Sequence, residues 1–174
     1  MRRSTDTVRT PRRQPADTRR PAVGVTIADR QRRVKLDRRW LEGVIRRAVA
    51  AIGSPAAEIG VVLVDDAGIA DLHEQWLGLP GPTDVITFDL STPVDSGLHG
   101  DIAISVETAR RLARELGWQT RHEAAYYAIH GLLHLAGEDD RDPARRRRMR
   151  ARERAVMTAL ELPRPPRRPV RGGS

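Results

Sequence analysis

The chain has 174 residues, enough for one domain with a hydrophobic core. It contains no cysteine, so disulfide bonds and thiolate metal sites are excluded and any metal must be bound by histidine and carboxylate. No apolar run reaches the roughly 20 residues needed to cross a bilayer. The Arg-rich start lacks the apolar stretch of a secretory signal. We therefore expect a cytoplasmic protein with no membrane partner, with an organelle transit peptide as the alternative.

Charge is distributed unevenly along the chain. The formal net charge is +8, yet residues 1–39 and residues 141–174 each carry +9, while residues 40–140 carry −10. Basic ends favour a polyanionic partner, most often nucleic acid, and an acidic centre suits a cation-binding site. The alternative is that the Arg-rich ends reflect only an arginine-biased proteome. The aromatic content of 3% is too low for a base-stacking platform.

Composition predicts one folded domain at residues 22–162. Residues 1–21 are largely Arg, Pro, Thr and Asp, and predict a disordered basic tail. Residues 163–174 predict a second disordered tail, rich in Pro and Arg, because Pro163 ends whatever precedes it.

Within that domain the hydrophobic pattern alternates between strand and helix periods. Apolar patterns predict four strands, at residues 22–28, 59–64, 84–90 and 101–105. Helical spacing predicts helices that begin at or after Asp37, Asp66, Ser105, Thr120 and Asp142. The linker between the last two strands is too short for a helical crossover, so these strands should pair antiparallel. The predicted fold class is α/β (α+β): a single compact domain with a small mixed sheet of about four strands.

The most informative segment is HGLLHLAGEDD, residues 130–140. His130 and His134 are four residues apart on a predicted helix, so their imidazoles project from one face, one turn apart. Gly137 can adopt the left-handed conformation that ends a helix, which lets Asp140 return beneath the imidazoles. Three protein ligands leave an open position, which is typical of a catalytic metal site. The spacing therefore predicts a metal site formed by His130, His134 and Asp140.

Two histidines at this spacing are, taken alone, more often structural than metal-binding. Here the two histidines are followed by Gly137, at the position that can end the helix, and by a carboxylate three residues later. The chain has only five histidines in all. Metalloproteases of similar spacing place a glutamate directly after the first histidine as general base, whereas this chain has Gly131. A glycine inside a helix costs roughly 1 kcal/mol relative to alanine, so we expect that something needs room beside His130. The pattern favours a metal-dependent hydrolase that is not a protease.

Three motifs, in matching order and spacing, resemble the YbeY family. HGLLHLAGEDD is similar to the family signature HGxLHLxGxDH, PTDVITF at 82–88 to PTDVLSF, and HGDIAIS at 99–105 to LGDIxIS. The resemblance covers about residues 22–162. It implies a zinc-dependent, single-strand-selective endoribonuclease with one Zn²⁺ per chain, acting in maturation of small-subunit ribosomal RNA and in ribosome quality control. The implied partners are single-stranded or ribosomal RNA and the small ribosomal subunit.

The sequence departs from the family pattern in two places. The third ligand is Asp140 where the family has histidine; its oxygen remains a competent zinc ligand but adds a negative charge. The family string LNxxYR aligns with residues 72–77, so His73 replaces asparagine and Leu77 replaces arginine. An arginine near the metal would neutralise phosphate charge. Either another arginine, with Arg121 as a candidate, takes that role, or nuclease activity is weak.

Several other side chains are candidates for roles around the metal. The acidic residues Asp139 and Glu138 are candidate proton acceptors, with solvated turn residues as the alternative. Candidate substrate contacts are Thr83, Asp84, Arg121, Arg145 and Arg148. The spacing of Thr120 and Glu123 predicts a capping box. His99 and His122 are expected at the surface rather than as ligands.

Two other functions remain open from the sequence alone. One is a non-catalytic, metal-binding ribosome-assembly factor, which Leu77 favours because it replaces the family arginine. The other is a metal-dependent hydrolase of another substrate.

Overall fold

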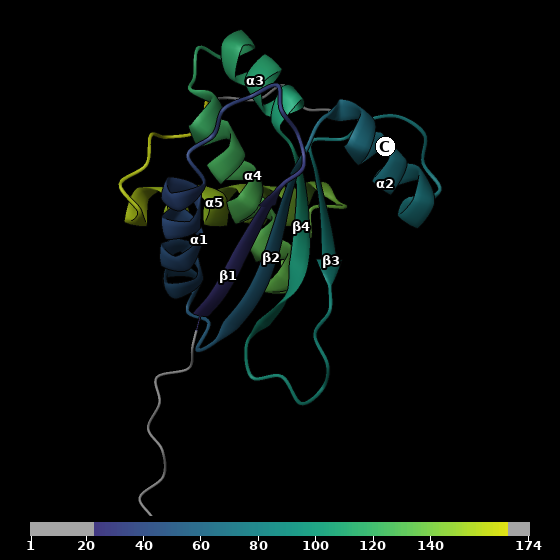
Figure 1. The fold of residues 1–174 in the computed structure, drawn as a ribbon. Coiled ribbons are helices and arrows are strands. Elements are labelled where there is room, and N and C mark those ends of the chain that lie inside the picture. Colours follow the sequence, from purple (N-terminus) through teal and green to yellow (C-terminus); the bar gives the residue numbers. More distant parts are fainter. Residues whose placement is uncertain (1–22, 167–174) are drawn as a thin grey trace, which may run out of the picture.

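The computed structural model describes residues 23–166, in which a four-stranded sheet is combined with five helices (Figure 1). The strands are β1 (Val23–Asp29), β2 (Ala57–Val64), β3 (Val85–Asp89) and β4 (Leu98–Ser105). The helices are α1 (Arg38–Ile52), α2 (Asp66–Leu77), α3 (Val106–Glu115), α4 (Thr120–Leu135) and α5 (Pro143–Ala159). The tail predicted at 1–21 lies outside the described residues, as do residues 167–174 of the second tail.

The sheet is mixed, with strand order β1-β2-β4-β3. β1 is parallel to β2 and β2 to β4, whereas β3 runs antiparallel to β4, with Val85 opposite Ile104 and Asp89 opposite Gly100. The prediction of a small mixed sheet whose last two strands are antiparallel is therefore confirmed.

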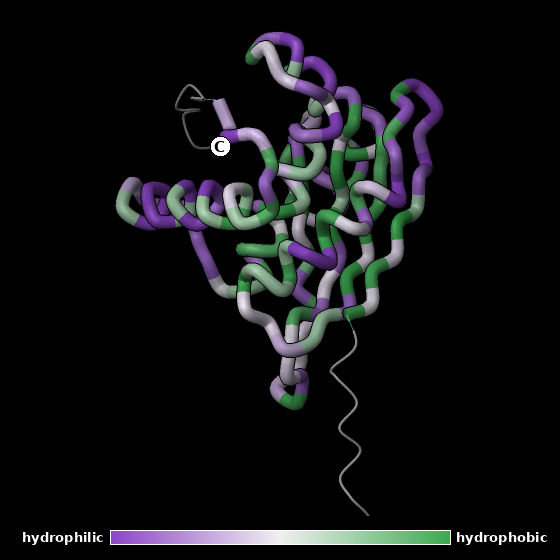
Figure 2. The backbone as a smooth tube through the Cα atoms, turned by 90° about the vertical axis from the view of Figure 1, so that its left-hand side faces the viewer, coloured by the Kyte–Doolittle hydropathy of each residue, from purple (hydrophilic) through white to green (hydrophobic). Residues whose placement is uncertain are grey.

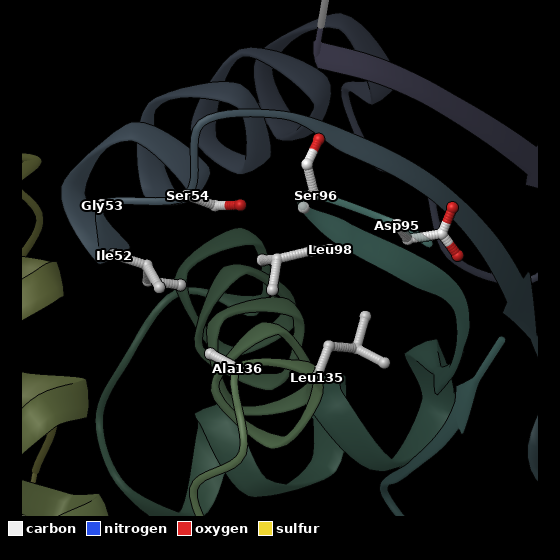
Figure 3. Close-up of a pocket in the computed structure, with 9 residues that line it drawn as sticks. Ile52, Gly53, Ser54, Asp95, Ser96, Leu98, Leu135 and Ala136 are labelled. Atoms are coloured by element: carbon white, nitrogen blue, oxygen red, sulfur yellow. The ribbon is translucent and has the colours of Figure 1, made fainter. Parts of the chain in front are cut away.

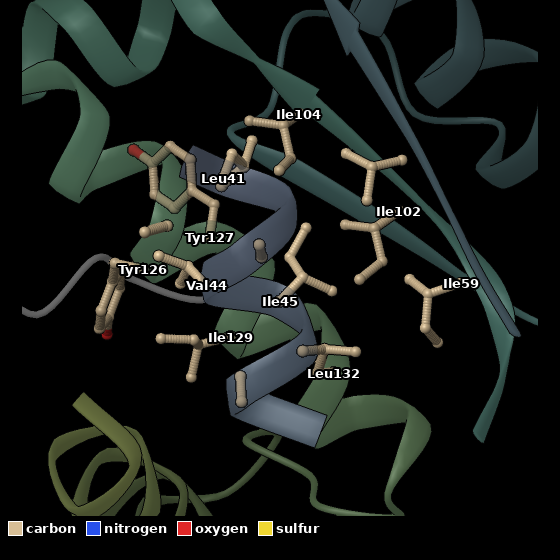
Figure 4. Close-up of a cluster of buried hydrophobic side chains, with 14 of the residues drawn as sticks. Leu41, Val44, Ile45, Ile59, Ile102, Ile104, Tyr126, Tyr127, Ile129 and Leu132 are labelled. Carbon is tan, nitrogen blue, oxygen red and sulfur yellow. The ribbon is translucent and has the colours of Figure 1, made fainter. Parts of the chain in front are cut away.

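The main hydrophobic core lies on one face of the sheet (Figure 4). Alternate residues of β2 and β4 point to this face, where α1 and α4 pack; they are Ile59, Val61, Leu63, Ile102 and Ile104. The opposite face carries a smaller cluster beneath α2, formed by Val64, Ile69, Ile86 and Ala103. In Figure 2 the hydrophobic residues gather on the strands and the helices packed against them, while the Arg-rich α5 is largely hydrophilic.

The central helix, α4, is enclosed on nearly every side. Twelve of its 16 residues are buried, because the sheet, α1, α3 and α5 all contact it. Gly131 lies directly against the sheet. A Cβ atom on Gly131 would lie 2.9 Å from both Thr87 Oγ1 and Ile102 Cδ1. The room expected beside His130 is thus taken by the sheet, and the helix is held tightly against it.

Most of the predicted helix starts are confirmed by their caps. The Asp37 side chain accepts a hydrogen bond from the Trp40 amide, and the Asp142 side chain accepts from Ala144 and Arg145. Helix α2 is capped by Asp65, one residue earlier than predicted.

The capping box at the start of α4 was a wrong prediction. The N-cap is Gln119, which makes no side-chain cap hydrogen bond, and Thr120 is already inside the helix. Glu123 is fully buried, unlike the exposed residues that usually form such a box. Tertiary burial has overridden the local capping pattern.

Replacing Gly131 with alanine should destabilise the protein, although alanine is the better helix former. Overpacking against Thr87 and Ile102 should lower the free energy of unfolding by about 1–3 kcal/mol, measured by chemical denaturation. The control is Gly43→Ala in α1, where a Cβ would meet nothing within 4 Å and stability should rise by up to about 1 kcal/mol. Equal stabilisation by both substitutions would contradict the role given to Gly131.

Candidate metal centre

The end of α4 places its last histidine against a tight turn. Gly137 has φ +87°, and its amide donates to the His134 carbonyl at 2.9 Å. The Glu138 amide donates to the Leu133 carbonyl, also at 2.9 Å. A left-handed residue with this pair of bonds ends a helix and reverses the chain. The prediction that Gly137 ends the helix is confirmed, and the reversal carries Asp140 back toward the histidines.

The structure brings the three candidate ligands together. His130 Nε2 and His134 Nε2 are 3.0 Å apart, and Asp140 Oδ1 is 4.0 Å from His134 Nε2. One ligand atom from each residue lies within 4.8 Å of the other two. The side chains are 21%, 29% and 41% exposed, so the group opens to solvent on one side. The arrangement could hold a metal ion.

Hydrogen bonds at the far side of each imidazole determine which nitrogen is available. His134 Nδ1 lies 3.0 Å from the Glu138 carbonyl, and His130 Nδ1 lies 2.7 Å from Glu153 Oε1. A carbonyl and a carboxylate can only accept, so both Nδ1 atoms must donate. Both Nε2 atoms are then left to face each other. At 3.0 Å, a proton or a metal ion can lie between the two nitrogens. Two imidazoles with one carboxylate form a donor set suited to zinc.

The two histidines have pKa values displaced in opposite directions. Burial opposes charge on His130, but the hydrogen bond and charge of Glu153, with the charges of Asp140 and Asp84, outweigh it and raise the pKa of His130. Burial and the neighbouring His130 lower the pKa of His134.

Arginines from α5 and the preceding loop surround the acidic turn. Arg145 contacts Asp139 at 2.7 Å and Arg141 contacts it at 3.3 Å, while Arg148 contacts Glu138 at 3.1 Å. The hydrogen bond from Arg145 is the main reason why the pKa of Asp139 falls to about 2. So weak a base is poorly suited to accept a proton near neutral pH, which weighs against the predicted role of Asp139. Glu138 is also held by arginine.

The structure separates the predicted substrate residues into two groups. Asp84 lies close enough to His130 for its charge to raise that pKa, and Thr83 hydrogen-bonds to Asp84 at 3.3 Å, so both belong beside the candidate site. Arg121 does not. It stacks 5.4 Å over the Trp40 ring and donates to Gln119. Nine residues before His130, it lies about 13 Å away along the helix axis.

The remaining histidines have other places in the fold. His122 is buried between Trp40 and Trp118, so the expectation of a surface position was wrong. His99 is partly exposed, 3.6 Å from Asp95. His73 lies 2.9 Å from the Gly81 carbonyl and closes the loop that leads to Thr83 and Asp84. Leu77, at the position of the family arginine, is 56% exposed.

Sequence reasoning missed Glu153, which is buried and contacts His130. A signal was available. Glu153 lies at helical spacing on the stripe formed by Met149, Val156 and Met157, all of which are buried. A single acidic residue on an otherwise apolar stripe of an Arg-rich helix indicates a buried partner.

A hollow of about 420 Å³ lies near the end of α4, between the end of α1 and the loop before β4 (Figure 3). Leu98 and Leu135 form its floor, and Ser54, Asp95 and Ser96 its rim. It contains none of the three candidate ligands. Within residues 23–166, no helix is long and apolar enough to span a membrane.

The fold and the three converging side chains define a class: an α/β domain with a candidate catalytic metal centre at the end of its central helix. The family model described as "Endoribonuclease YbeY" matches residues 26–161. The chain therefore belongs to the YbeY family of endoribonucleases, which are enzymes of the hydrolase class.

Relatives of this family are similar over most of the chain. Endoribonuclease YbeY of Pelotomaculum thermopropionicum is 36% identical over 151 residues, which cover 80% of this chain and 99% of the relative. Endoribonuclease YbeY of Anaeromyxobacter sp. is 45% identical over 114 residues, covering 65% and 59%. The solution structure of TM1509 from Thermotoga maritima has a TM-score of 0.53 at 22% identity, covering 80% of this chain and 92% of that one, and supports the fold.

Removing Arg145 should raise the pKa of Asp139 from about 2 toward its ordinary value of 3.8, because Arg145 supplies the largest stabilisation of the carboxylate. Titration of the Asp139 carboxyl carbon by NMR in the Arg145→Gln protein measures this change. Arg141→Gln is the matched control and should cause a smaller rise. An ordinary pKa for Asp139 in the unsubstituted protein would contradict the proposed effect of Arg145 on that carboxylate.

Proposed function

We propose that this chain is a zinc-dependent, single-strand-selective endoribonuclease, which acts in the cytoplasm in small-subunit ribosomal RNA maturation and ribosome quality control. The observation that carries the proposal is the convergence of His130 Nε2 and His134 Nε2 at 3.0 Å beside Asp140. Family membership supports the reaction class and RNA as the substrate.

His130, His134 and Asp140 hold one zinc ion in this proposal. When bound, zinc activates water and polarises a phosphoryl oxygen. The protein's part is to orient the ligands: the Glu138 carbonyl and the Glu153 carboxylate each accept from one imidazole, so both Nε2 atoms are presented to the same point. Asp140 adds one negative charge to the centre.

The family arginine is replaced by Leu77, so phosphate must be neutralised by another group. Arg145 and Arg148 of α5 are the suitable candidates, since they contact Asp139 and Glu138, the two residues before Asp140. Their side chains are 54% and 63% exposed, which leaves guanidinium surface for the RNA backbone. Arginine binds phosphate through paired hydrogen bonds. We assign these two arginines to the substrate.

Thr83 and Asp84 are proposed to line the substrate side of the centre, because the charge of Asp84 acts on His130 and Thr83 hydrogen-bonds to Asp84 at 3.3 Å. Of the two acidic candidates, Asp139 is poorly suited to accept a proton, since the hydrogen bond from Arg145 lowers its pKa to about 2, and Glu138 remains a candidate.

A non-catalytic ribosome-assembly factor is the second candidate, and the exposed Leu77 favours it. In that case metal would stabilise the fold and the arginines would bind RNA without cleavage. The deciding experiment incubates the purified chain with single-stranded and duplex RNA, with and without a chelator, followed by addition of zinc. We expect the single-stranded RNA to be cleaved, the chelator to abolish this cleavage, and added zinc to restore it. RNA binding without cleavage would favour the assembly factor, and cleavage of neither RNA but of another ester would favour a different substrate.

Loss of one ligand should remove the metal. Elemental analysis should find about one zinc per chain, and His134→Ala should lose it because two remaining ligands hold zinc weakly. Asp140→Ala should weaken zinc binding sharply, whereas Asp140→His should retain it, since imidazole is also a zinc ligand. If Asp140→Ala binds zinc as tightly as the unsubstituted chain, a neighbouring carboxylate is the third ligand instead.

Loss of Arg148 should weaken RNA binding in a salt-dependent way. Arg148→Gln should reduce the slope of log affinity against log salt by about 0.7, the value for one phosphate contact on a single strand. The measurement is a fluorescence anisotropy titration at several salt concentrations. Arg46→Gln on α1 is the matched control, because it removes the same charge and also contacts a glutamate, at 2.8 Å. Equal effects of both substitutions would mean that only net charge matters.

A further inference from the structure

A buried carboxylate of α5 is joined to the metal centre. Glu153 is 3% exposed although it lies in α5, the most Arg-rich of the helices within residues 23–166. Burying an ionised carboxylate costs several kcal/mol unless hydrogen bonds and charge compensate. Both of its oxygens are engaged: Oε2 accepts from the Tyr126 hydroxyl at 2.5 Å, and Oε1 accepts from His130 Nδ1 at 2.7 Å. Two residues of α4 therefore contribute to this compensation.

The spacing of the two partners explains this arrangement. Tyr126 and His130 are four residues apart on α4, so they lie one turn apart on the same face. Figure 4 shows Tyr126 with its hydroxyl turned toward α5. One carboxylate can thus bridge two successive turns of the central helix, with one oxygen for each.

We infer that Glu153 is a positioning residue for the metal centre, acting through His130, with Tyr126 holding Glu153 in turn. The inference rests on the proposed metal site. Because Oε1 accepts from Nδ1, the imidazole keeps its proton there and presents Nε2 to His134 and Asp140. A carboxylate in this place also makes the histidine a stronger ligand.

The two histidines are oriented by different means. His134 is oriented by the Glu138 carbonyl, four residues away in its own turn. His130 is oriented by a charged group 23 residues away on another helix. Metal affinity should therefore depend on the docking of α5 as well as on the local turn. A competing explanation is that Glu153 only ties α5 to α4, and the two explanations predict different measurements.

The first test measures zinc affinity by competition with a chromogenic chelator. Glu153→Gln keeps the shape but removes the charge, and should weaken zinc binding by about 10–100-fold. Tyr126→Phe leaves the carboxylate on His130, so its loss should be smaller. Gln31→Leu is the control for stability alone: it removes the buried hydrogen bonds of Gln31 to the Val34 carbonyl, at 2.8 Å, and from the Val34 amide, at 2.9 Å. Gln31 follows β1, at the edge of the sheet opposite to β3, so the substitution should lower the melting temperature without changing zinc affinity. If Glu153→Gln behaves like Gln31→Leu, the inference is wrong.

The second test needs no substitution. Imidazole ¹⁵N NMR of the unsubstituted, zinc-loaded chain should show His130 protonated at Nδ1 and coupled to metal through Nε2. The reversed tautomer would overturn the inference even if Glu153→Gln failed to fold. Absence of zinc binding by the unsubstituted chain would instead refute the metal site itself, so the two failures are distinguishable.

Discussion

The close packing of α4 against the sheet is the constraint on which the candidate site depends. Gly131 lies between the two histidines in sequence, and the absence of a side chain there lets Thr87 and Ile102 contact the helix backbone. With the helix held in this way, its two histidines have little freedom to rotate about the helix axis. A ligand pair on a loosely packed helix would need to be ordered when the metal binds, at an entropic cost that this arrangement avoids.

Much of the fold followed from short-range patterns. Strand and helix periods identified the four strands and five helices, and the spacing from His130 to Asp140 predicted which side chains would meet. These predictions succeeded because they depend on backbone geometry over one or two turns. Family membership was equally accessible, since the motifs are contiguous in the sequence.

The failures have a common cause, which is that contacts between distant segments are invisible to local spacing. Glu123 has the spacing of a capping box, yet its side chain is buried. Arg121 was a candidate for the missing arginine, although nine residues amount to two and a half helical turns, which places it on the opposite face from His130. Glu153 could be assigned to His130 only after α5 was seen to cross α4.

The position of Glu153 in the chain has a consequence for shortened forms of the protein. All three candidate ligands precede it, and the nearest, Asp140, is separated from it by more than half of α5. A chain that ended before Glu153 would therefore keep all three candidate ligands and lose the carboxylate that accepts from His130 Nδ1.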